Sequence, residues 1–363
     1  MSRRIAVIPG DGVGPEVIEI GLRVLEAAAA ADPSFEYETV SFPWGSEHYL
    51  RTGAMMEADG LDQLAQFDAI YFGAVGSREV PDHITLWGLR LAIVQGFDQA
   101  ISLRPAKLLP GVRGLLAGRG AEDVDLVVVR ENTEGEYSGV GGFAHAGQPS
   151  EVALQTSVYT RAAIERTARY AFELARQRPR QKLTSVTKSN ASPHASVLWD
   201  RVVEDVAADY PDVEWGSILV DAAAARLVLD PGSLDVLVAS NLFGDILSDL
   251  TGALTGSLGM APSGNLQLNG TYPSMFEPVH GSAFDIVGKG IANPVGAVLS
   301  AAMMLDELGA AQIASAIRHA VENVCARGIL TPDVGGMASS ADVAEAMIEV
   351  IGQHVSTPGE VRT

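Results

Sequence analysis

The hydrophobic pattern of this chain is dominated by short, largely apolar runs, each followed by glycine or by polar residues. These runs occupy residues 5–8, 69–72, 124–129, 183–186, 218–220 and 235–239. Such runs are typical of strands that are buried on both faces. Between them lie segments with helical spacing of apolar residues, for example 161–178. The alternation predicts an α/β protein with substantial parallel strand pairing.

The segment 241–250, with the sequence NLFGDILSDL, predicts a helix with two distinct faces. Asp245 and Asp249 lie one turn apart on one face, where carboxylates could bind Mg²⁺ or Mn²⁺ or simply face solvent. The other face is predicted to anchor the helix in the core through Leu242, Phe243, Ile246, Leu247 and Leu250.

The first strand runs into the glycine-rich segment 10–15, with the sequence GDGVGP, and then into a helix. Its glycine spacing differs from the dinucleotide fingerprint G-x-G-x-x-G, so a classical Rossmann unit is not predicted. A tight turn is expected here, where a substrate or cofactor could approach the backbone. The segment 252–296 is rich in glycine and proline and is predicted to consist of loops.

Composition and charge limit the kinds of binding partner and metal site that are expected. The 363 residues carry a formal net charge of −20, which disfavours nucleic acid and anionic membranes as partners. Cys325 is the only cysteine, so neither a disulfide framework nor a thiolate metal site is predicted, and its thiol is expected to be buried. The chain shows no signal-peptide pattern and no apolar run of about 18 residues, so a cytoplasmic protein is expected.

Several polar residues follow predicted strands, where α/β folds place ligands. Asp221 could join Asp245 and Asp249 as an oxygen ligand for a divalent cation. Lys188 is either a surface cation or a base with a lowered pKa, and Tyr137 is either a proton donor or a packed aromatic. Two arginines suit the binding of substrate carboxylates: Arg104, in the segment Leu103-Arg104-Pro105, and Arg130, which follows the apolar run at 124–129.

Longer motifs resemble a known family. They are IAVIPGDGVGPE at 5–16, NLFGDILSDL at 241–250, FEPVHGSAFDIVGKGIANP at 276–294 and AAMML at 301–305. Nearly the whole chain resembles the metal-dependent β-decarboxylating dehydrogenases, which include isopropylmalate, isocitrate, homoisocitrate and tartrate/D-malate enzymes. The tartrate/D-malate branch is the most similar, through FPWGSEHYL at 42–50, VPDHITLWGL at 80–89, VVRENTEGEYS at 128–138 and PSMFEPVHGSA at 273–283.

The resemblance implies an isopropylmalate/isocitrate dehydrogenase-like fold, with two α/β domains and an active-site cleft between them. Residues 1–103 and 256–363 would form the large domain, which holds both termini and the cofactor loop. Residues 104–255 would form the small domain, which holds the metal aspartates and the dimer interface.

The resemblance also implies NAD-dependent oxidative decarboxylation of a small, anionic 2-hydroxydicarboxylate of the D-malate or tartrate type. Asp221, Asp245 and Asp249 would hold Mg²⁺ or Mn²⁺. Lys188 would accept the hydroxyl proton, and Tyr137 would protonate the enolate that remains after loss of CO₂. In the family the lysine and one aspartate reach the neighbouring subunit's site, which implies a homodimer that shares Lys188 and Asp221.

The resemblance also implies a cofactor loop, HGSAFDIVGKG at 280–290. Glu277 is expected near the nicotinamide, and His280 and Asn293 beside the adenine. Asp285 would accept hydrogen bonds from the adenosine ribose and would repel a 2′-phosphate, which favours NAD over NADP. Further expected contacts are Gly281, Ser282, Ala283 and Ile286.

The chain departs from the family pattern at one clamp position. Relatives carry a third substrate-binding arginine ten residues before Arg104, where this chain has Val94 followed by Gln95. Arg90 lies one helical turn earlier on the same face, and we expect it to replace part of the clamp. Two alternatives remain open at this stage: 3-isopropylmalate dehydrogenase, which a cationic Arg90 disfavours, and a non-catalytic regulatory subunit.

The replacement of the clamp residue makes a testable prediction. Arg90→Ala removes the guanidinium that is expected to bind a substrate carboxylate, so KM for the substrate should rise in steady-state assays. An unchanged KM would contradict this role for Arg90.

Overall fold

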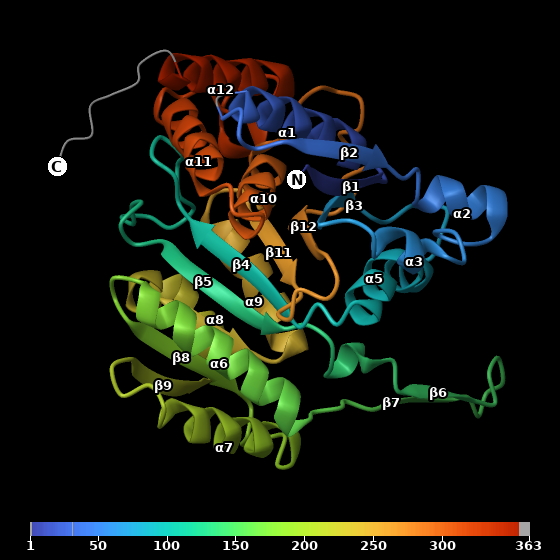
Figure 1. Cartoon of the computed structure of the whole chain (residues 1–363). Coiled ribbons are helices and arrows are strands. Elements are labelled where there is room, and N and C mark those ends of the chain that lie inside the picture. The colour runs from blue at the N-terminus through green and yellow to red at the C-terminus, as the bar shows by residue number, and fades with distance from the viewer. Residues whose placement is uncertain (1, 31, 356–363) are drawn as a thin grey trace.

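The structure, a computed structural model, describes residues 2–30 and 32–355 and is built around one large mixed β-sheet (Figure 1). Its ten strands are β1 (Arg3–Gly10), β2 (Tyr37–Ser41), β3 (Ala69–Ala74), β4 (Ile101–Lys107), β5 (Asp125–Glu131), β8 (Lys182–Thr187), β9 (Glu214–Leu219), β10 (Val236–Ala239), β11 (Pro262–Leu266) and β12 (Ser274–Pro278). A separate two-stranded ribbon consists of β6 (Gly141–Ala144) and β7 (Val152–Gln155). The predicted α/β class and the six predicted strands are confirmed.

The sheet order is β2-β1-β3-β12-β11-β4-β5-β10-β8-β9. Strands from the two ends of the chain therefore occupy one half of the sheet, and strands from the middle of the chain occupy the other. Pairing is parallel except at the centre, where β12, β11, β4 and β5 are antiparallel neighbours. The two halves meet where β11 pairs with β4. The assignment of these halves to two domains with the bounds given above stays a prediction.

Helices cover the sheet on both faces (Figure 1). They are α1 (Gly14–Ala29), α2 (Ser46–Thr52), α3 (Gly60–Leu64), α4 (Asp82–Thr85), α5 (Leu91–Gly96), α6 (Arg161–Gln177), α7 (Ala195–Ala207), α8 (Val220–Leu229), α9 (Asn241–Leu254), α10 (Val295–Glu307), α11 (Ala311–Ala326) and α12 (Ser340–Val355). In the half of the sheet formed by the middle of the chain, α6 and α9 lie on opposite faces of β5. In the other half, α1, α10, α11 and α12 pack against one another. The described helices include none that is long and apolar enough to cross a membrane.

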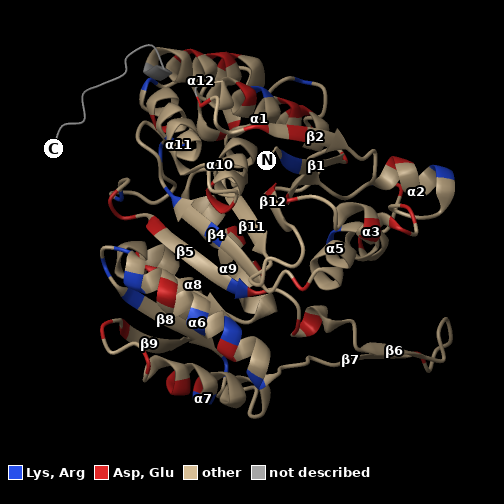
Figure 2. Cartoon of the chain, in the orientation of Figure 1, with Lys and Arg blue, Asp and Glu red and all other residues tan. Residues whose placement is uncertain are grey.

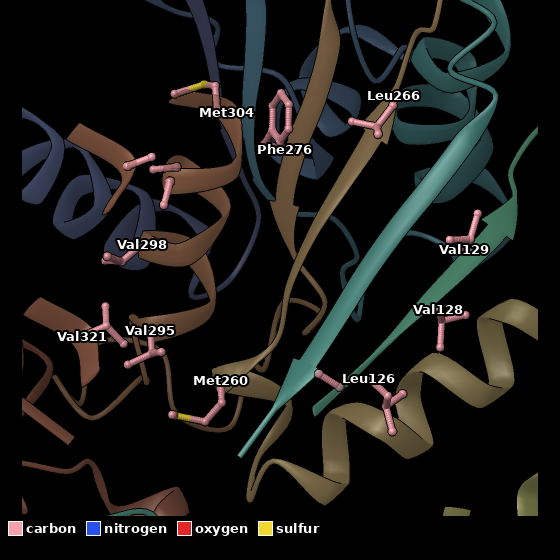
Figure 3. Close-up of a cluster of buried hydrophobic side chains, with 14 of the residues drawn as sticks. Leu126, Val128, Val129, Met260, Leu266, Phe276, Val295, Val298, Met304 and Val321 are labelled. Carbon is pink, nitrogen blue, oxygen red and sulfur yellow. The ribbon is translucent and has the colours of Figure 1, made fainter. Parts of the chain in front are cut away.

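The main core joins the two halves. Phe276 of β12, Met304 of α10 and Val128 of β5 belong to one continuous cluster of buried side chains, part of which is drawn in Figure 3. Cys325 of α11 is buried in the same cluster, as expected. Because one core spans strands from both parts of the sequence, the pocket residues described below are held by a common framework.

Two expectations are wrong. The segment 252–296 is not all loop, because it contains β11 and β12. These strands escape an apolar pattern because Ser263, Asn265 and Glu277 are polar although buried in the sheet. Asp221 does not end a strand either: β9 ends at Leu219 and Asp221 lies in the first turn of α8.

The predicted packing of α9 needs a further correction. Only Leu247 of the five expected anchors is fully buried, and Ile246 is 57% exposed. The buried face instead carries small residues, among them Gly244, Ser248 and Gly252. Small side chains let α9 lie close to β5, which turns Ile246 outward.

Most charged residues lie on helices and in loops (Figure 2), and few of them are buried. Asp235, which is fully buried just before β10, is an exception. Its carboxylate accepts hydrogen bonds from Arg178 Nε at 2.5 Å and from Arg180 Nη2 at 3.1 Å. These bonds attach the loop after α6 to the start of β10, an inner strand of the sheet.

The contrast between Asp235 and Asp125 tests this attachment. Asp235→Ala should lower the free energy of unfolding by about 3 kcal/mol, because it removes the buried acceptor of a charged pair. Asp125 also pairs with Arg178, at 2.8 Å, but its side chain is half exposed, so Asp125→Ala should cost less than about 1 kcal/mol. Urea denaturation of both variants measures the difference, and equal losses would contradict the attachment.

Candidate functional site

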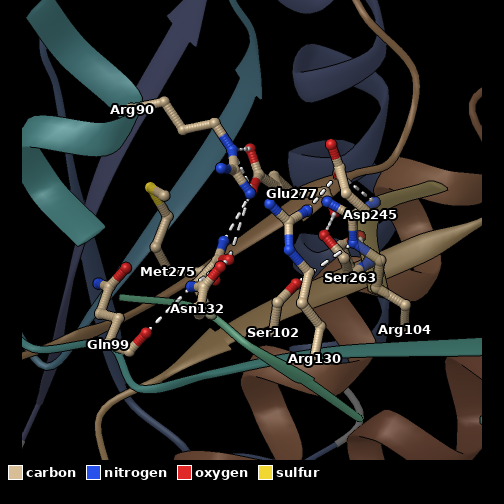
Figure 4. Close-up of polar contacts among 12 residues, drawn as sticks. Arg90, Gln99, Ser102, Arg104, Arg130, Asn132, Asp245, Ser263, Met275 and Glu277 are labelled. Carbon is tan, nitrogen blue, oxygen red and sulfur yellow. Dashed lines mark hydrogen bonds and ion pairs between the residues drawn. The ribbon is translucent and has the colours of Figure 1, made fainter. Parts of the chain in front are cut away.

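A stripe of polar residues runs across the antiparallel centre of the sheet. Strand register places Arg130 of β5 opposite Ser102 of β4, and Ser102 opposite Asn265 of β11. Because every second residue of a strand points to the same face, Arg104 shares that face with Ser102. Glu277 of β12 lies opposite Ser263, two residues from Asn265, and completes the stripe. Figure 4 shows these side chains gathered on one side of the strands.

Helix α9 presents its polar residues to this stripe. Asn241, Asp245, Ser248 and Asp249 recur at helical spacing and face the arginines of β4 and β5. The close approach requires Gly244, since a Cβ there would lie 2.6 Å from Cβ of Arg130. The helix and the strand therefore hold the acids and the arginines in contact.

Each of the two strand arginines is held by partners from α9. Arg130 donates from Nε and Nη2 to the Asn241 side-chain oxygen, at 2.9 and 2.6 Å, and its Nη1 contacts Asp245. Arg104 donates from Nη1 to the Ser248 hydroxyl at 2.7 Å. The same nitrogen lies 3.6 Å from a carboxylate oxygen of each aspartate, Asp245 and Asp249. Both guanidinium groups are thereby oriented before any ligand binds.

Arg90 reaches the same place from a different element. It ends a π-helical turn, Leu86–Arg90, a local widening that often occurs at functional sites. Its Nη2 lies 2.6 Å from Glu277 Oε1, and its Nε donates to the same carboxylate at 2.8 Å. Val94, at the usual clamp position, is fully buried among apolar side chains, so Arg90 is the residue of this segment that enters the polar centre.

Tyr137 lies in a short 3-10 turn, Glu136–Ser138, and faces the helix. Its hydroxyl donates to Asp245 Oδ2 at 2.7 Å, and its ring lies under the Arg130 guanidinium, 5.1 Å from the ring centroid. Gln95 donates to the Tyr137 carbonyl at 2.8 Å and holds the turn from the side of α5. The phenol is therefore a polar group of the site rather than only a packed ring.

These side chains line one pocket of about 190 Å³. The predicted site residues among its lining are Arg90, Arg104, Arg130, Tyr137, Asp245, Asp249, Glu277, His280 and Gly281. The pocket is smaller than the roughly 300–1,000 Å³ typical of drug-sized ligands, so it suits a small metabolite.

Lys188 and Asp221 are not brought to this pocket within the chain. Lys188 Nζ lies 2.5 Å from Asp221 Oδ1, and neither residue lines the pocket. Among the residues that the structure describes, no cluster of three or more acids, histidines or cysteines could hold a metal ion. A single chain thus supplies two carboxylates, Asp245 and Asp249, and presents the Lys188–Asp221 pair elsewhere.

The predicted cofactor loop begins in the pocket lining, with His280 and Gly281. The backbone of Val13 donates to the Ser282 carbonyl at 2.9 Å, and Gly12 has no room for a side chain because a Cβ would lie 1.9 Å from that carbonyl. The glycine turn after β1 therefore supports this loop. His280 Nε2 is buried without a hydrogen-bond partner among the described residues, which leaves it available to a ligand.

The other expected cofactor residues are spread along the loop. Asp285 is exposed, whereas Ile286 packs against the cluster around Val13. Asn293 is buried, and its amide already bonds to Asp333 and to the backbone of Val295. Its side chain therefore supports the loop.

The arginines of the pocket influence the pKa values of the neighbouring acids. Burial disfavours ionisation of Asp245, but Arg130 and Arg104 outweigh this effect and lower the pKa of the carboxyl. Burial likewise opposes ionisation of Glu277, and Arg90 lowers the pKa of that group. Both acids are consequently anionic partners of the arginines.

Two further groups shift in the direction of their neutral forms. Burial raises the pKa of Asp249 although Arg104 is near. Burial, together with the hydrogen bond to Asp245, raises the pKa of Tyr137, so the phenol keeps its proton at neutral pH. Tyr137 can thus act as a proton donor, and a bound cation would favour the charged form of Asp249.

The structure also shows supporting residues that were not predicted. Asn241 and Ser248 could have been found, because they share the helical face of the two aspartates. Asn265, Asn132 and Ser102 gave no local signal, since they come from strands whose alignment only the folded chain reveals.

Comparison with known proteins agrees with this geometry. Residues 4–351 match the family described as isocitrate/isopropylmalate dehydrogenase, and the chain belongs to that family. A probable tartrate dehydrogenase/decarboxylase of Agrobacterium vitis is 56% identical over 96% of this chain and 97% of its own length. A D-malate dehydrogenase [decarboxylating] of Escherichia coli is 51% identical over 96% of this chain and 99% of its own length. The resemblance to the tartrate/D-malate branch is confirmed.

Solved structures confirm the fold. The crystal structure of isocitrate dehydrogenase from Methylococcus capsulatus superposes with a TM-score of 0.86 at 35% identity, covering 96% of this chain and 99% of that one. The fold is therefore isocitrate dehydrogenase-like, as predicted.

Proposed function

We propose that this protein catalyses NAD-dependent oxidative decarboxylation of a small 2-hydroxydicarboxylate of the D-malate or tartrate type, with Mg²⁺ or Mn²⁺. The observation that carries the proposal is the convergence of three buried arginines, two aspartates and Tyr137 in one small pocket. Relatives named for tartrate and D-malate oxidation and decarboxylation support the reaction class.

The arginines account for the substrate. Arg90, Arg104 and Arg130 place three positive charges in a pocket of a protein whose net charge is −20. A guanidinium binds carboxylates through paired hydrogen bonds, so a dicarboxylate fits this pocket better than a neutral ligand does. The third arginine also disfavours 3-isopropylmalate, whose apolar group would lie among charges. A non-catalytic subunit is disfavoured because Tyr137 and both pocket aspartates are present and converge.

Proton transfers fall to Lys188 and Tyr137. Lys188 would accept the proton of the substrate hydroxyl as hydride leaves the carbon that bears it. Loss of CO₂ from the resulting keto acid leaves an enolate, and the protonated phenol of Tyr137 would donate a proton to its carbon. The Tyr137 hydroxyl is already directed into the pocket by its bond to Asp245.

The donor set fits a hard divalent cation. Asp245 and Asp249 offer carboxylate oxygens from one helix face, with Asp221 of a second copy as the third acid. When bound, the ion would supply Lewis-acid stabilisation of the developing oxyanion. NAD would supply the hydride acceptor, with His280 and Asp285 along its adenosine part. The exposed carboxylate of Asp285 favours NAD over NADP.

A homodimer that shares its sites explains the remote position of Lys188 and Asp221. Apolar residues of α8 and α9 are exposed together, with Leu229 72% and Ile246 57% accessible. The β6–β7 ribbon projects from the body and exposes Phe143 and Leu154 (Figure 1). Such surfaces mark protein contacts, and a two-fold axis would use the same patch on both copies. The proposed cellular location is the cytoplasm.

A substrate panel tests the reaction. NADH and CO₂ formation should be measured with D-malate, the tartrate isomers, 3-isopropylmalate and isocitrate, with NAD or NADP. We expect NAD-dependent turnover of D-malate or a tartrate, which is lost with a chelator and restored by Mn²⁺. Preference for 3-isopropylmalate would contradict the substrate assignment, and no turnover of any dicarboxylate would contradict the reaction.

Subunit mixing tests the shared site. Lys188→Ala and Tyr137→Phe should each be nearly inactive as homodimers. Equal mixtures refolded or expressed together should regain about a quarter of the unaltered activity, because half of the dimers are hybrids with one intact site of two. The matched control mixes Tyr137→Phe with Asp245→Asn, which damage the same side of the site and should show no recovery. Equal results for both mixtures would contradict sharing.

A further inference from the structure

Asn265 of β11 occupies the centre of a buried polar network that the proposed reaction does not explain. Its side chain is fully buried. Its Nδ2 donates to Glu277 Oε1 at 2.7 Å and to the Met275 carbonyl at 3.4 Å. Its Oδ1 accepts from Arg90 Nη2 at 3.3 Å and from Asn132 Nδ2 at 3.1 Å. The side chain thus lies between the two members of the Arg90–Glu277 ion pair and bonds to both.

These four bonds are all that a carboxamide can make, two as donor and two as acceptor. They also determine which atom is oxygen, because reversing the amide would set the oxygen against Glu277 and the nitrogen against Arg90. An aspartate would lose both donors, and an apolar residue would lose all four bonds. The network therefore requires an amide at this position.

Asn132 holds the Asn265 side chain through a hydrogen bond to its oxygen. Its Nδ2 donates both to Asn265 Oδ1 and to the Gln99 carbonyl, at 3.0 Å for the latter. Asn132 is itself buried. Through these contacts, the position of Arg90 is tied to β5 and to the end of α5, not only to Glu277.

Glu277 and Asn265 together hold two of the three Arg90 nitrogens. Nε and Nη2 bond to these partners, whereas Nη1 makes no hydrogen bond to a residue that the structure describes. Arg90 lines the pocket, so Nη1 is the donor left for a ligand. When two of its nitrogens are held by partners, a guanidinium presents the third in a fixed direction. Binding a ligand there then costs little further conformational entropy.

We propose that Asn265 is a positioning residue for substrate recognition: it holds Arg90 against Glu277 so that the free edge of the guanidinium binds the substrate carboxylate remote from the metal ligands. This inference rests on the proposed dicarboxylate oxidation. Asn265 acts through Arg90, while Asp245 and Asp249 are oriented by Arg130 and Arg104, so its effect is confined to one end of the substrate.

Two ligands distinguish binding at the metal end of the site from binding at the Arg90 end. Oxalate can chelate the cation with both carboxylates and has no further group, whereas D-malate carries an additional carboxylate for the arginines. Dissociation constants of both should be measured by calorimetry on the full chain with Mn²⁺ and without NAD. In Asn265→Asp and Asn265→Leu, the constant for D-malate should rise about tenfold, and that for oxalate should change less than about twofold.

A matched control removes another buried amide of the same region. Gln99 is fully buried and its Nε2 donates to the Pro273 carbonyl at 2.9 Å, and among the described residues its side chain forms no hydrogen bond with Arg90, Glu277 or Asn265. Gln99→Leu should lower thermal stability and leave the ratio of the two dissociation constants unchanged. A loss of stability alone therefore cannot produce the expected pattern.

The outcomes separate the two proposals. If the unaltered chain binds D-malate and both Asn265 variants leave the ratio unchanged, Asn265 does not position Arg90 and the proposed function stands. Equal weakening of oxalate and D-malate would also overturn the positioning role, because the effect would have reached the metal side. Failure of the unaltered chain to bind D-malate or any dicarboxylate of the panel would overturn both proposals.

Discussion

Burying three guanidinium groups in one pocket is the constraint on which the rest of this structure depends. A buried charge is tolerated only when partners neutralise it and satisfy its hydrogen bonds. Here Arg90 is paired with Glu277, and Arg130 and Arg104 are paired with the acids of α9. These pairings explain why polar residues occupy the antiparallel centre of a sheet and why a glycine lies where α9 approaches Arg130. The pocket thus contains positive charges that neighbouring acids hold in place.

The sequence predicted the parts of this arrangement that leave a local periodic signal. The apolar runs identified strands such as β3 and β10, and the spacing of Asp245 and Asp249 identified the face of α9 that lines the pocket. It did not identify β11 and β12, because Asn265 and Glu277 place polar side chains in strands buried on both faces. Their polarity is compensated by partners from β4, β5 and the π-helical turn, far away in the chain, and no local pattern contains that information.

The candidate site likewise combines residues that the sequence identified with features that only the folded chain reveals. Arg104, Arg130 and Tyr137 were recognised through motifs and share a pocket. The substitution at Val94 was visible in the sequence, and the structure explains how it is accommodated: the valine completes an apolar cluster while Arg90 enters the polar centre. The separation of Lys188 and Asp221 from the pocket could not be derived from spacing, because it depends on how the strands and helices that carry these residues are arranged in the folded chain.

The pairing of β11 with β4 has a mechanical consequence. Three aligned residue pairs, from Gly264↔Leu103 to Leu266↔Ile101, connect the two halves of the sheet through main-chain hydrogen bonds. Moving one half relative to the other would therefore have to deform this hydrogen-bonded ladder. Asn265 lies within this β11–β4 pairing, so the side chain that bonds to both Arg90 and Glu277 is carried by a strand that joins the two halves.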